Sequence, residues 1–323
     1  MISKSKVNQG KKRILDRSIT TRELIFLVCL VLCLSPIISP PVALLLGIVI
    51  AQFVGHPYLH LNHKFTHILL QASVVGLGFG MPLDSVLQAS RDGVFLTVIS
   101  IISVLVLGYF LGRILKVNKN ITFLISVGTA ICGGSAIAAV SPILKAEERQ
   151  ISVAIGTIFM LNSLALFIFP FIGHILHLSQ MQFGLWCAIG IHDTSSVVGA
   201  ASKYGNEALQ IATTVKLARA LWIIPVACIS SLMVKSKGVK IKIPYFIGLF
   251  ILAVLLSYYV PFFQRIDTYI VSISKAGMTL TLFLIGAGLS RKALASVGFK
   301  PILLGIILWV LIAIPMLLVI LNL

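Results

Sequence analysis

Two clusters of polar residues interrupt otherwise apolar stretches of the chain. They are Gly128-Thr129-Ala130-Ile131-Cys132-Gly133-Gly134-Ser135 and Gly190-Ile191-His192-Asp193-Thr194-Ser195-Ser196. Glycine pairs and Ser/Thr clusters weaken a helix and free its backbone N–H and C=O groups. A helix that restarts after such a break presents N–H groups at a positive dipole end, which suits an anion. Close helix packing through small residues is the alternative for Gly133-Gly134.

The charged residues inside apolar stretches are few. Asp193 is the one carboxylate in the interior of such a stretch, since the other eight acids lie in loops or at interfaces. Lys216 and Arg219 share a helix face because they stand three residues apart. Ionisable groups at membrane depth commonly mark functional sites. We expect the two cations to face a bound anion, and Asp193 to serve as counter-ion or, when protonated, as coupling group beside His192. The alternative is that both cations extend to the outer interface, because run 218–234 is short for a span.

The predicted site combines substrate contacts with a coupling pair. Its substrate-binding residues are Lys216, Arg219, Gly133, Gly134, Ser135, Thr194, Ser195 and Ser196, and its coupling residues are Asp193 and His192.

Enzymatic and metal chemistry find little support in the sequence. It contains no H-E-x-x-H, Walker loop or G-x-S-x-G. One carboxylate in the interior of the apolar runs is too few for a two-aspartate intramembrane protease. His56, His60, His63 and His67 could share a helix face, but Pro57 and the lack of nearby carboxylates favour a polar loop. We expect no enzyme activity, no metal and no cofactor.

Composition places these residues in a membrane protein. Of the 323 residues, 58% are hydrophobic and 11% are charged, and the mean hydropathy is +1.06, which excludes a soluble globular domain. We predict an all-α polytopic membrane protein with about eleven transmembrane helices, two of them broken near the midplane. The apolar runs fall at about 23–39, 41–54, 65–81, 93–112, 121–143, 151–172, 183–201, 210–233, 244–261, 266–289 and 301–321.

The distribution of cations predicts the topology. Seven Lys and Arg residues lie in segment 1–22, which is expected to be a basic cytoplasmic segment before a single transmembrane domain at 23–323. If the N-terminus is inside, 18 cations lie in cytoplasmic segments and 5 lie outside, as the positive-inside rule requires. The net charge of +17 therefore reflects topology and not nucleic-acid binding. No cleavage pattern follows the first run, which indicates an uncleaved helix.

Two internal similarities indicate repeats. Leu77-Gly78-Phe79-Gly80-Met81 matches Ile285-Gly286-Ala287-Gly288-Leu289, and the topology places these copies in opposite orientations. This predicts an inverted repeat with halves at about 41–172 and 183–321, as in many secondary transporters. A weaker match pairs Ala130, Val140, Lys145 and Ala154 with Ala188, Val198, Lys203 and Ala212. Eleven crossings would give these units one orientation, so either the match is chance or one unit is re-entrant.

Three segments resemble the YeiH-type family of bacterial membrane proteins, which are proposed sulfate exporters. They are Ile131-Cys132-Gly133-Gly134-Ser135-Ala136-Ile137-Ala138-Ala139, Gly190-Ile191-His192-Asp193 with Val197-Val198-Gly199-Ala200, and Ala212-Thr213-Thr214-Val215-Lys216-Leu217-Ala218-Arg219. The resemblance covers nearly the whole chain, and it implies a fold related to sodium/proton antiporters and bile-acid symporters. The residue after the histidine is commonly Glu in the family, so Asp193 is a shorter carboxylate.

The resulting hypothesis is a secondary transporter of the bacterial cytoplasmic membrane. It would lie in the lipid bilayer and export sulfate or a related small anion, coupled to a proton or sodium. The chain could form a homodimer. An anion channel is one alternative, although no span is uniformly amphipathic as a pore lining would be. A membrane subunit or sensor without transport is the other.

Overall fold

The computed structural model describes residues 21–35, 37–55, 57–234, 245–289 and 297–322. Most of the predicted basic segment 1–22 lies outside these ranges, as do His56, Arg291, Lys292 and the cations of 235–242.

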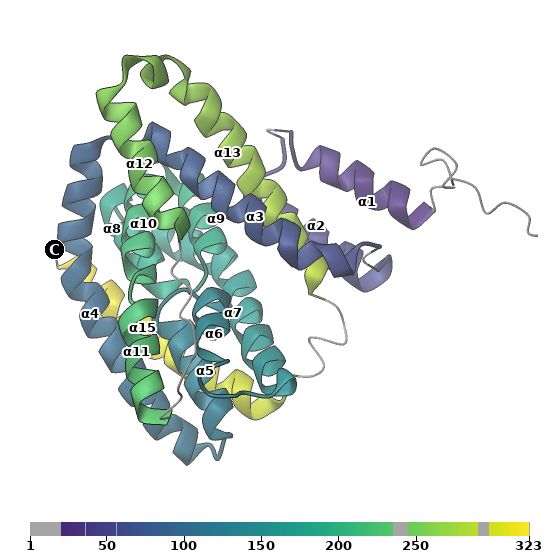
Figure 1. The fold of residues 1–323 in the computed structure, drawn as a ribbon, viewed down its shortest axis with the longest axis vertical. Helices are drawn as coiled ribbons and strands as arrows, with labels where there is room; N and C mark the ends of the chain where they lie inside the picture. Colours follow the sequence, from purple (N-terminus) through teal and green to yellow (C-terminus); the bar gives the residue numbers. More distant parts are fainter. Residues whose placement is uncertain (1–20, 36, 56, 235–244, 290–296, 323) are drawn as a thin grey trace, which may run out of the picture.

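The described part of the chain is helical and contains no strand, as predicted (Figure 1). Each of the eleven predicted apolar runs overlaps one or two helices. The elements are α1 (Thr21–Leu32), α2 (Pro40–Phe53), α3 (Leu59–Leu77), η1 (Gly78–Gly80), α4 (Leu83–Ile114), α5 (Lys119–Ala130), α6 (Gly134–Val140), α7 (Glu148–Ile175), α8 (Gln180–Gly190), α9 (Thr194–Tyr204), α10 (Asn206–Ala220), α11 (Ile223–Val234), α12 (Tyr245–Tyr259), α13 (Pro261–Gly288) and α15 (Phe299–Leu321).

Several of these helices have the length and apolar composition of membrane-spanning helices. Among the described residues, five stretches are long and apolar enough to cross one: Phe95–Ile114, Glu148–Ile175, Asn206–Leu232, Pro261–Gly288 and Phe299–Leu321. Shorter apolar helices lie at Pro40–Phe53, Phe65–Gly80 and Tyr245–Tyr259. The chain is therefore a polytopic membrane protein.

The run at 121–143 does not cross the bundle but folds back as a hairpin. It forms α5 and α6, and its two open ends lie together, because the Asn120 side chain at the start of α5 donates to Gln150 Oε1 at the start of α7, at 3.0 Å. The sequence leaves open whether one of the two broken units is re-entrant, and the position of these ends agrees with a re-entrant hairpin. A helix of 12 residues covers only about 18 Å, too little to span a core of about 30 Å.

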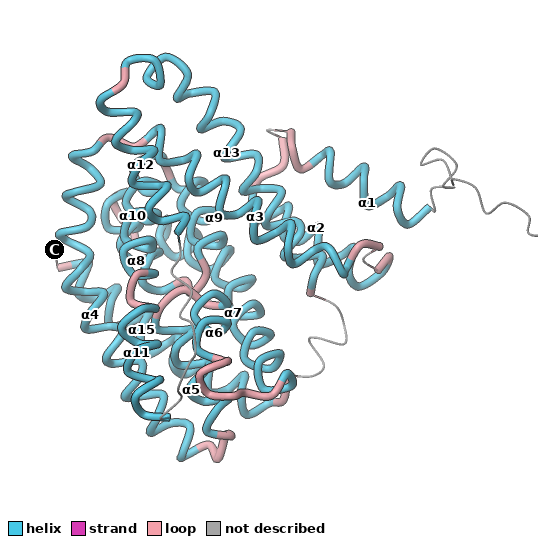
Figure 2. Tube along the Cα trace, in the orientation of Figure 1, coloured by secondary structure: helices cyan, strands magenta, loops and turns pink. Residues whose placement is uncertain are grey.

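The run at 183–201 forms a second hairpin, α8–α9, which opens at the other end of α7. Tyr204 at the end of α9 donates its hydroxyl to the carbonyl of Leu178 at 2.7 Å. Its ring stacks on that of Phe183, with 3.8 Å between the ring centroids. The N–H of Glu207 donates to Gln180 Oε1 at 3.1 Å. The intervening α7 has 28 residues and covers about 42 Å, so the two hairpins enter from opposite sides of the bundle. Their breaks are short loop segments between helices (Figure 2).

Four other helices, α2, α3, α12 and α13, form a panel that packs largely on itself (Figure 1). Helices α2 and α13 cross closely at Gly47 and Gly286, where a Cβ on either residue would collide with the backbone of the other helix. Helices α3 and α13 run antiparallel, since Asn62 near the start of α3 donates to the carbonyl of Leu284 near the end of α13. The two Gly-rich motifs therefore lie at opposite ends of this helix pair.

The hairpins make a topology prediction that differs from the sequence-based one. In a variant without the five native cysteines, single cysteines at Lys116 and Lys145 should react with a membrane-impermeant maleimide from the same side. A cysteine at Lys203 should react from the opposite side, because α7 separates the hairpin openings. All three residues are exposed, so labelling in intact and permeabilised cells distinguishes the two sides. If Lys116 and Lys145 label from opposite sides, α5–α6 crosses the membrane, and if Lys145 and Lys203 label from one side, α8–α9 crosses it; either result contradicts the hairpin assignment.

Candidate functional site

The breaks of the two hairpins meet in the middle of the bundle. Gly133, in the α5–α6 break, has φ +64°, a conformation that favours glycine. A Cβ built on Gly133 would lie 3.5 Å from the Asp193 Cβ and 3.6 Å from its Cα. Asp193 belongs to the α8–α9 break, so the tips of the hairpins touch. The structure thus brings together the two polar clusters of the sequence.

Arg219, near the C-terminus of α10, joins the two tips. Its guanidinium donates to the carbonyls of Ala130 at 2.6 Å and Thr129 at 3.4 Å in α5, and to that of Ile189 at 2.9 Å in α8. The last carbonyls of a helix have no partner within that helix and carry its negative dipole end. Arg219 therefore caps the C-terminal ends of α5 and α8 at once.

Lys216 caps the α8 end from the same face of α10. Its ammonium donates to the carbonyls of Ala188 at 3.2 Å and Ile191 at 2.6 Å. The exposed fraction of both Lys216 and Arg219 is 0%, which contradicts the alternative that these cations reach the membrane interface.

Asp193 caps the helix that leaves the second break. Its Oδ2 accepts hydrogen bonds from the backbone N–H groups of Ser195 at 3.1 Å and Ser196 at 3.3 Å, and from the Ser195 hydroxyl. A carboxylate at a helix N-terminus satisfies free N–H groups and favours the positive dipole end. Both cations donate to carbonyls and not to this carboxylate.

The charges at the junction do not balance. Within the described part of the chain, the buried charged side chains are Lys216, Arg219 and Asp193. Two helix C-termini and two helix N-termini meet here, and their partial charges of about half an elementary charge each cancel. With all three side chains ionised, the junction carries a net charge of about +1.

Lys216 and Arg219 also have N–H groups that make no hydrogen bond among the described residues. An ammonium has three N–H groups and a guanidinium has five. The hydrogen bonds among the described residues use two from Lys216 and three from Arg219. The site can therefore donate to a further acceptor, as an anion-binding site requires.

The other predicted site residues surround the same junction. Thr194, Ser195 and Ser196 are buried in the first turn of α9. Gly133 in the α5–α6 break is buried, and at the start of α6 Gly134 is half-buried and Ser135 is exposed. His192 is 1% exposed, and its ring lies edge-on to Trp309. Lys275, outside the site, donates to Asn206 Oδ1 at 3.1 Å and links α13 to the start of α10.

The two hairpins are covered unequally. The panel helices α2 and α13 pack on α9, and every residue from 194 to 201 is buried. On α6, Ser135 and Ala138 are exposed, and so is Pro142 just beyond it. In the weaker internal match these three align with Asp193, Ser196 and Ala200, all of which are buried. The junction of the two hairpins is therefore less covered on the α6 side than on the α9 side.

Asn162 is a site residue that the sequence analysis missed. It lies in the middle of α7, and its Oδ1 accepts hydrogen bonds from the backbone N–H groups of His192 at 3.1 Å and Asp193 at 3.3 Å. A polar amide within the apolar run 151–172 was the available signal, because such residues are costly in a membrane.

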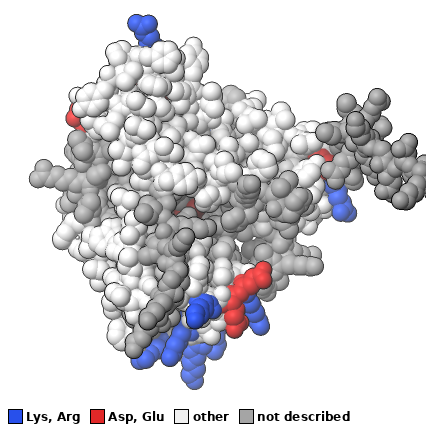
Figure 3. All heavy atoms as spheres, viewed as in Figure 1, with Lys and Arg blue, Asp and Glu red and all other residues white. Residues whose placement is uncertain are grey.

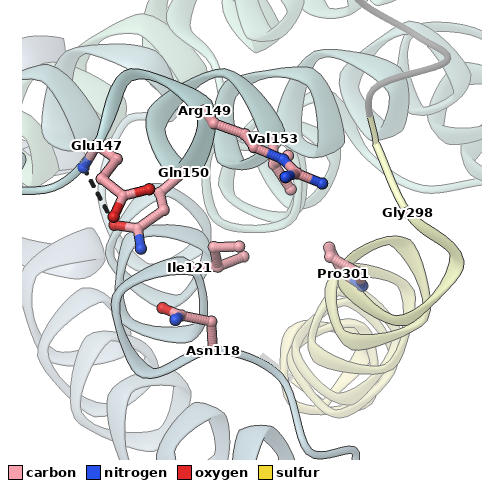
Figure 4. Close-up of a pocket in the computed structure, with 8 residues that line it drawn as sticks. All are labelled: Asn118, Ile121, Glu147, Arg149, Gln150, Val153, Gly298 and Pro301. Carbon is pink, nitrogen blue, oxygen red and sulfur yellow. Dashed lines mark hydrogen bonds between the residues drawn. The ribbon is translucent and has the colours of Figure 1, made fainter.

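A separate surface pocket lies at the opening of the α5–α6 hairpin (Figure 4). Its volume is about 310 Å³, and its lining residues are Asn118, Ile121, Glu147, Arg149, Gln150, Val153, Gly298 and Pro301. None of the predicted site residues lines it. The α5 helix places it about 18 Å from the break.

Comparison with known proteins identifies the family. A family model described as "Conserved hypothetical protein 698" matches residues 24–305. A UPF0324 membrane protein of Porphyromonas gingivalis is 53% identical over 281 residues, which is 86% of this chain and 85% of the relative. Another from Bacteroides thetaiotaomicron is 53% identical over 85% of this chain and 84% of the relative. A third, from Photobacterium profundum, is 51% identical over 88% of each.

No solved structure matches the chain. The names of the relatives state a membrane protein and no activity. The family match and this level of identity confirm the resemblance found in the three sequence segments. The chain belongs to the UPF0324 family of membrane proteins, the YeiH-type family.

Proposed function

We propose that the protein is a secondary transporter of a small anion. The observation that carries this proposal is the buried pair Lys216 and Arg219, which outweighs the single carboxylate Asp193 and keeps unused N–H donors. An uncompensated charge in a membrane interior is unfavourable, so a bound anion would stabilise the junction. Sulfate and related oxyanions offer several acceptor oxygens, and they agree with the proposed role of the family.

The arrangement of the hairpins supports alternating access. Two hairpins that open to opposite sides and meet at the midplane are what an inverted repeat produces. The weaker internal match then pairs α5–α6–α7 with α8–α9–α10, and the antiparallel Gly-rich motifs of α3 and α13 pair the panel helices. In this state α9 is covered by the panel, whereas Ser135, Ala138 and Pro142 on the α6 side are exposed. If α6 became covered and α9 became uncovered, the site would be exposed to the opposite side of the membrane.

The charge distribution supports a cytoplasmic position for the α6 side. With two hairpins, Lys145 and Arg149 join the cytoplasmic loops, and the split of Lys and Arg changes from 18 to 5 into 20 to 3. Figure 3 shows exposed Lys and Arg side chains gathered at one end of the molecule. The N-terminus would then be inside, and the less covered α6 side would face the cytoplasm of a bacterial cell, the side from which an exporter loads its substrate.

Binding and flux measurements test this proposal. The melting temperature of the purified protein should rise with sulfate, sulfite or thiosulfate, and should not rise with taurine alone or with Na⁺ alone. Proteoliposomes should accumulate the stabilising anion in response to a proton or sodium gradient. Flux that follows only the anion's own gradient would favour a channel. If no anion binds or moves, a subunit without transport becomes the better explanation.

A further inference from the structure

The side chain of Asn162 has one engaged end and one unengaged end. Its oxygen accepts hydrogen bonds from two backbone N–H groups, those of His192 and Asp193. Backbone N–H groups only donate, so the oxygen and not the nitrogen must face the break. The Asn162 Nδ2 has no hydrogen-bond partner among the described residues, although the side chain is only 3% exposed.

The neighbouring imidazole of His192 is also buried without hydrogen-bond partners among the described residues. His192 is 1% exposed, and neither ring nitrogen has a hydrogen-bond partner in the described structure. Trp309, the aromatic residue beside it, donates its indole N–H to the carbonyl of Gly190 at 2.9 Å. Buried N–H groups without acceptors are unfavourable, particularly where no bulk water can reach them. Two such groups next to one break indicate a binding position.

The position can be assigned a chemistry. Asn162 Nδ2 supplies two N–H donors, and a neutral imidazole supplies one. Lys216 donates to the carbonyl of Ile191 in the same break and has one N–H left over. Residues of α7, the α8–α9 break and α10 that carry unused donors therefore meet at the short segment 191–193, and a ligand with several acceptor atoms would pair these donors.

We propose that the Asn162 amide is a specificity-determining contact to an oxyanion, and that it donates Nδ2–H to a ligand oxygen while its own oxygen holds the break. This inference rests on the proposed anion transport. The cations supply attraction to any anion, whereas a neutral amide in a fixed orientation selects for acceptor oxygens at one place. A site with oriented donors discriminates against ligands that leave those donors unpaired.

Asn162→Asp separates the two ends of the side chain. The aspartate has the same shape and keeps an oxygen for the N–H groups of His192 and Asp193, but it replaces the donor with a negative oxygen. We expect a melting temperature close to that of the wild type and sulfate binding weakened by about 100-fold or more, because like charges would then face each other. Ser163→Ala is the matched control on α7, since the Ser163 hydroxyl donates to the carbonyl of Phe159 within its own helix.

The outcomes separate this inference from the proposed function. Titration of wild-type protein with sulfate comes first, and its failure would remove the anion site itself. If the wild type binds and Asn162→Asp binds equally well, Asn162 is a structural residue and the inference fails. If Asn162→Asp does not fold, Asn162→Ser is measured, with a loss of about 10-fold expected for the missing amide donor. Unchanged affinity in that folded variant would equally overturn the inference.

Discussion

Arg219→Ala is expected to abolish anion binding and to lower the melting temperature. The guanidinium is the group that caps α5 and α8 together, through the carbonyls of Thr129, Ala130 and Ile189. Its removal leaves these carbonyls without donors at the centre of the bundle and removes one of two buried positive charges. Each buried acceptor left unpaired costs about 1–3 kcal/mol, so we expect a total loss of about 3 kcal/mol or more. Thermal melts with and without sulfate measure both effects.

Arg219→Lys distinguishes charge from geometry. It keeps the positive charge, but a single ammonium cannot match the planar fork that reaches both hairpins. We expect a folded protein whose sulfate affinity is about 10- to 100-fold weaker, which corresponds to about 1.4–2.8 kcal/mol. Arg149→Ala is the matched control, because Arg149 is exposed at the start of α7, and its loss should leave binding unchanged. Wild-type affinity in both Arg219 variants would show that the cation is a structural cap.

Much of the junction could be predicted from residue types. The polar clusters predicted breaks in two helices, and the breaks occur at Ile131–Gly133 and Ile191–Asp193. The Gly133-Gly134 pair marks the first, since its backbone adopts a positive φ. Asp193 followed by Thr194, Ser195 and Ser196 marks the second, because a carboxylate followed by free N–H groups starts a helix. Such local preferences depend on adjacent residues and can therefore be predicted from the sequence.

The direction of the chain after each break could not be predicted from the same residues. A broken helix that continues and one that turns back have the same composition, and only contacts such as Asn120–Gln150 and Tyr204–Leu178 separate them. Lys145 and Arg149 on the nominally external side were the available hint. The role of Asn162 was equally hidden, since it depends on backbone N–H groups about 30 residues away in the chain.

Asp193→Asn is expected to keep anion binding and to remove its pH dependence. When Asp193 is ionised, the junction carries a net charge of about +1, and protonation raises this to about +2 because both cations are then uncompensated. Anion affinity in the wild type should therefore rise as the pH falls. A proton and an anion that bind cooperatively in this way are thermodynamically coupled. Asparagine should hold the affinity at the low-pH level across about pH 5 to 8, the range that a carboxylate in such surroundings can cover.

The substitution suits the test because it preserves the local structure. An asparagine oxygen can still accept the N–H groups of Ser195 and Ser196, so the N-cap of α9 survives. Sulfate titrations over this pH range, on protein with an unchanged melting profile, give the result directly.

His192 is the competing source of pH dependence, because histidine titrates in the same range. It lies next to Asp193 and faces Trp309, while the two cations lie across the junction on α10. Protonating the imidazole would add positive charge and also raise anion affinity at low pH, so the wild-type profile alone cannot separate the two residues. His192→Gln, measured in parallel, should retain the pH dependence if the carboxylate is the coupling group. If the dependence persists in Asp193→Asn and disappears in His192→Gln, Asp193 is only the cap of α9, and the proton that accompanies the anion is carried by the histidine.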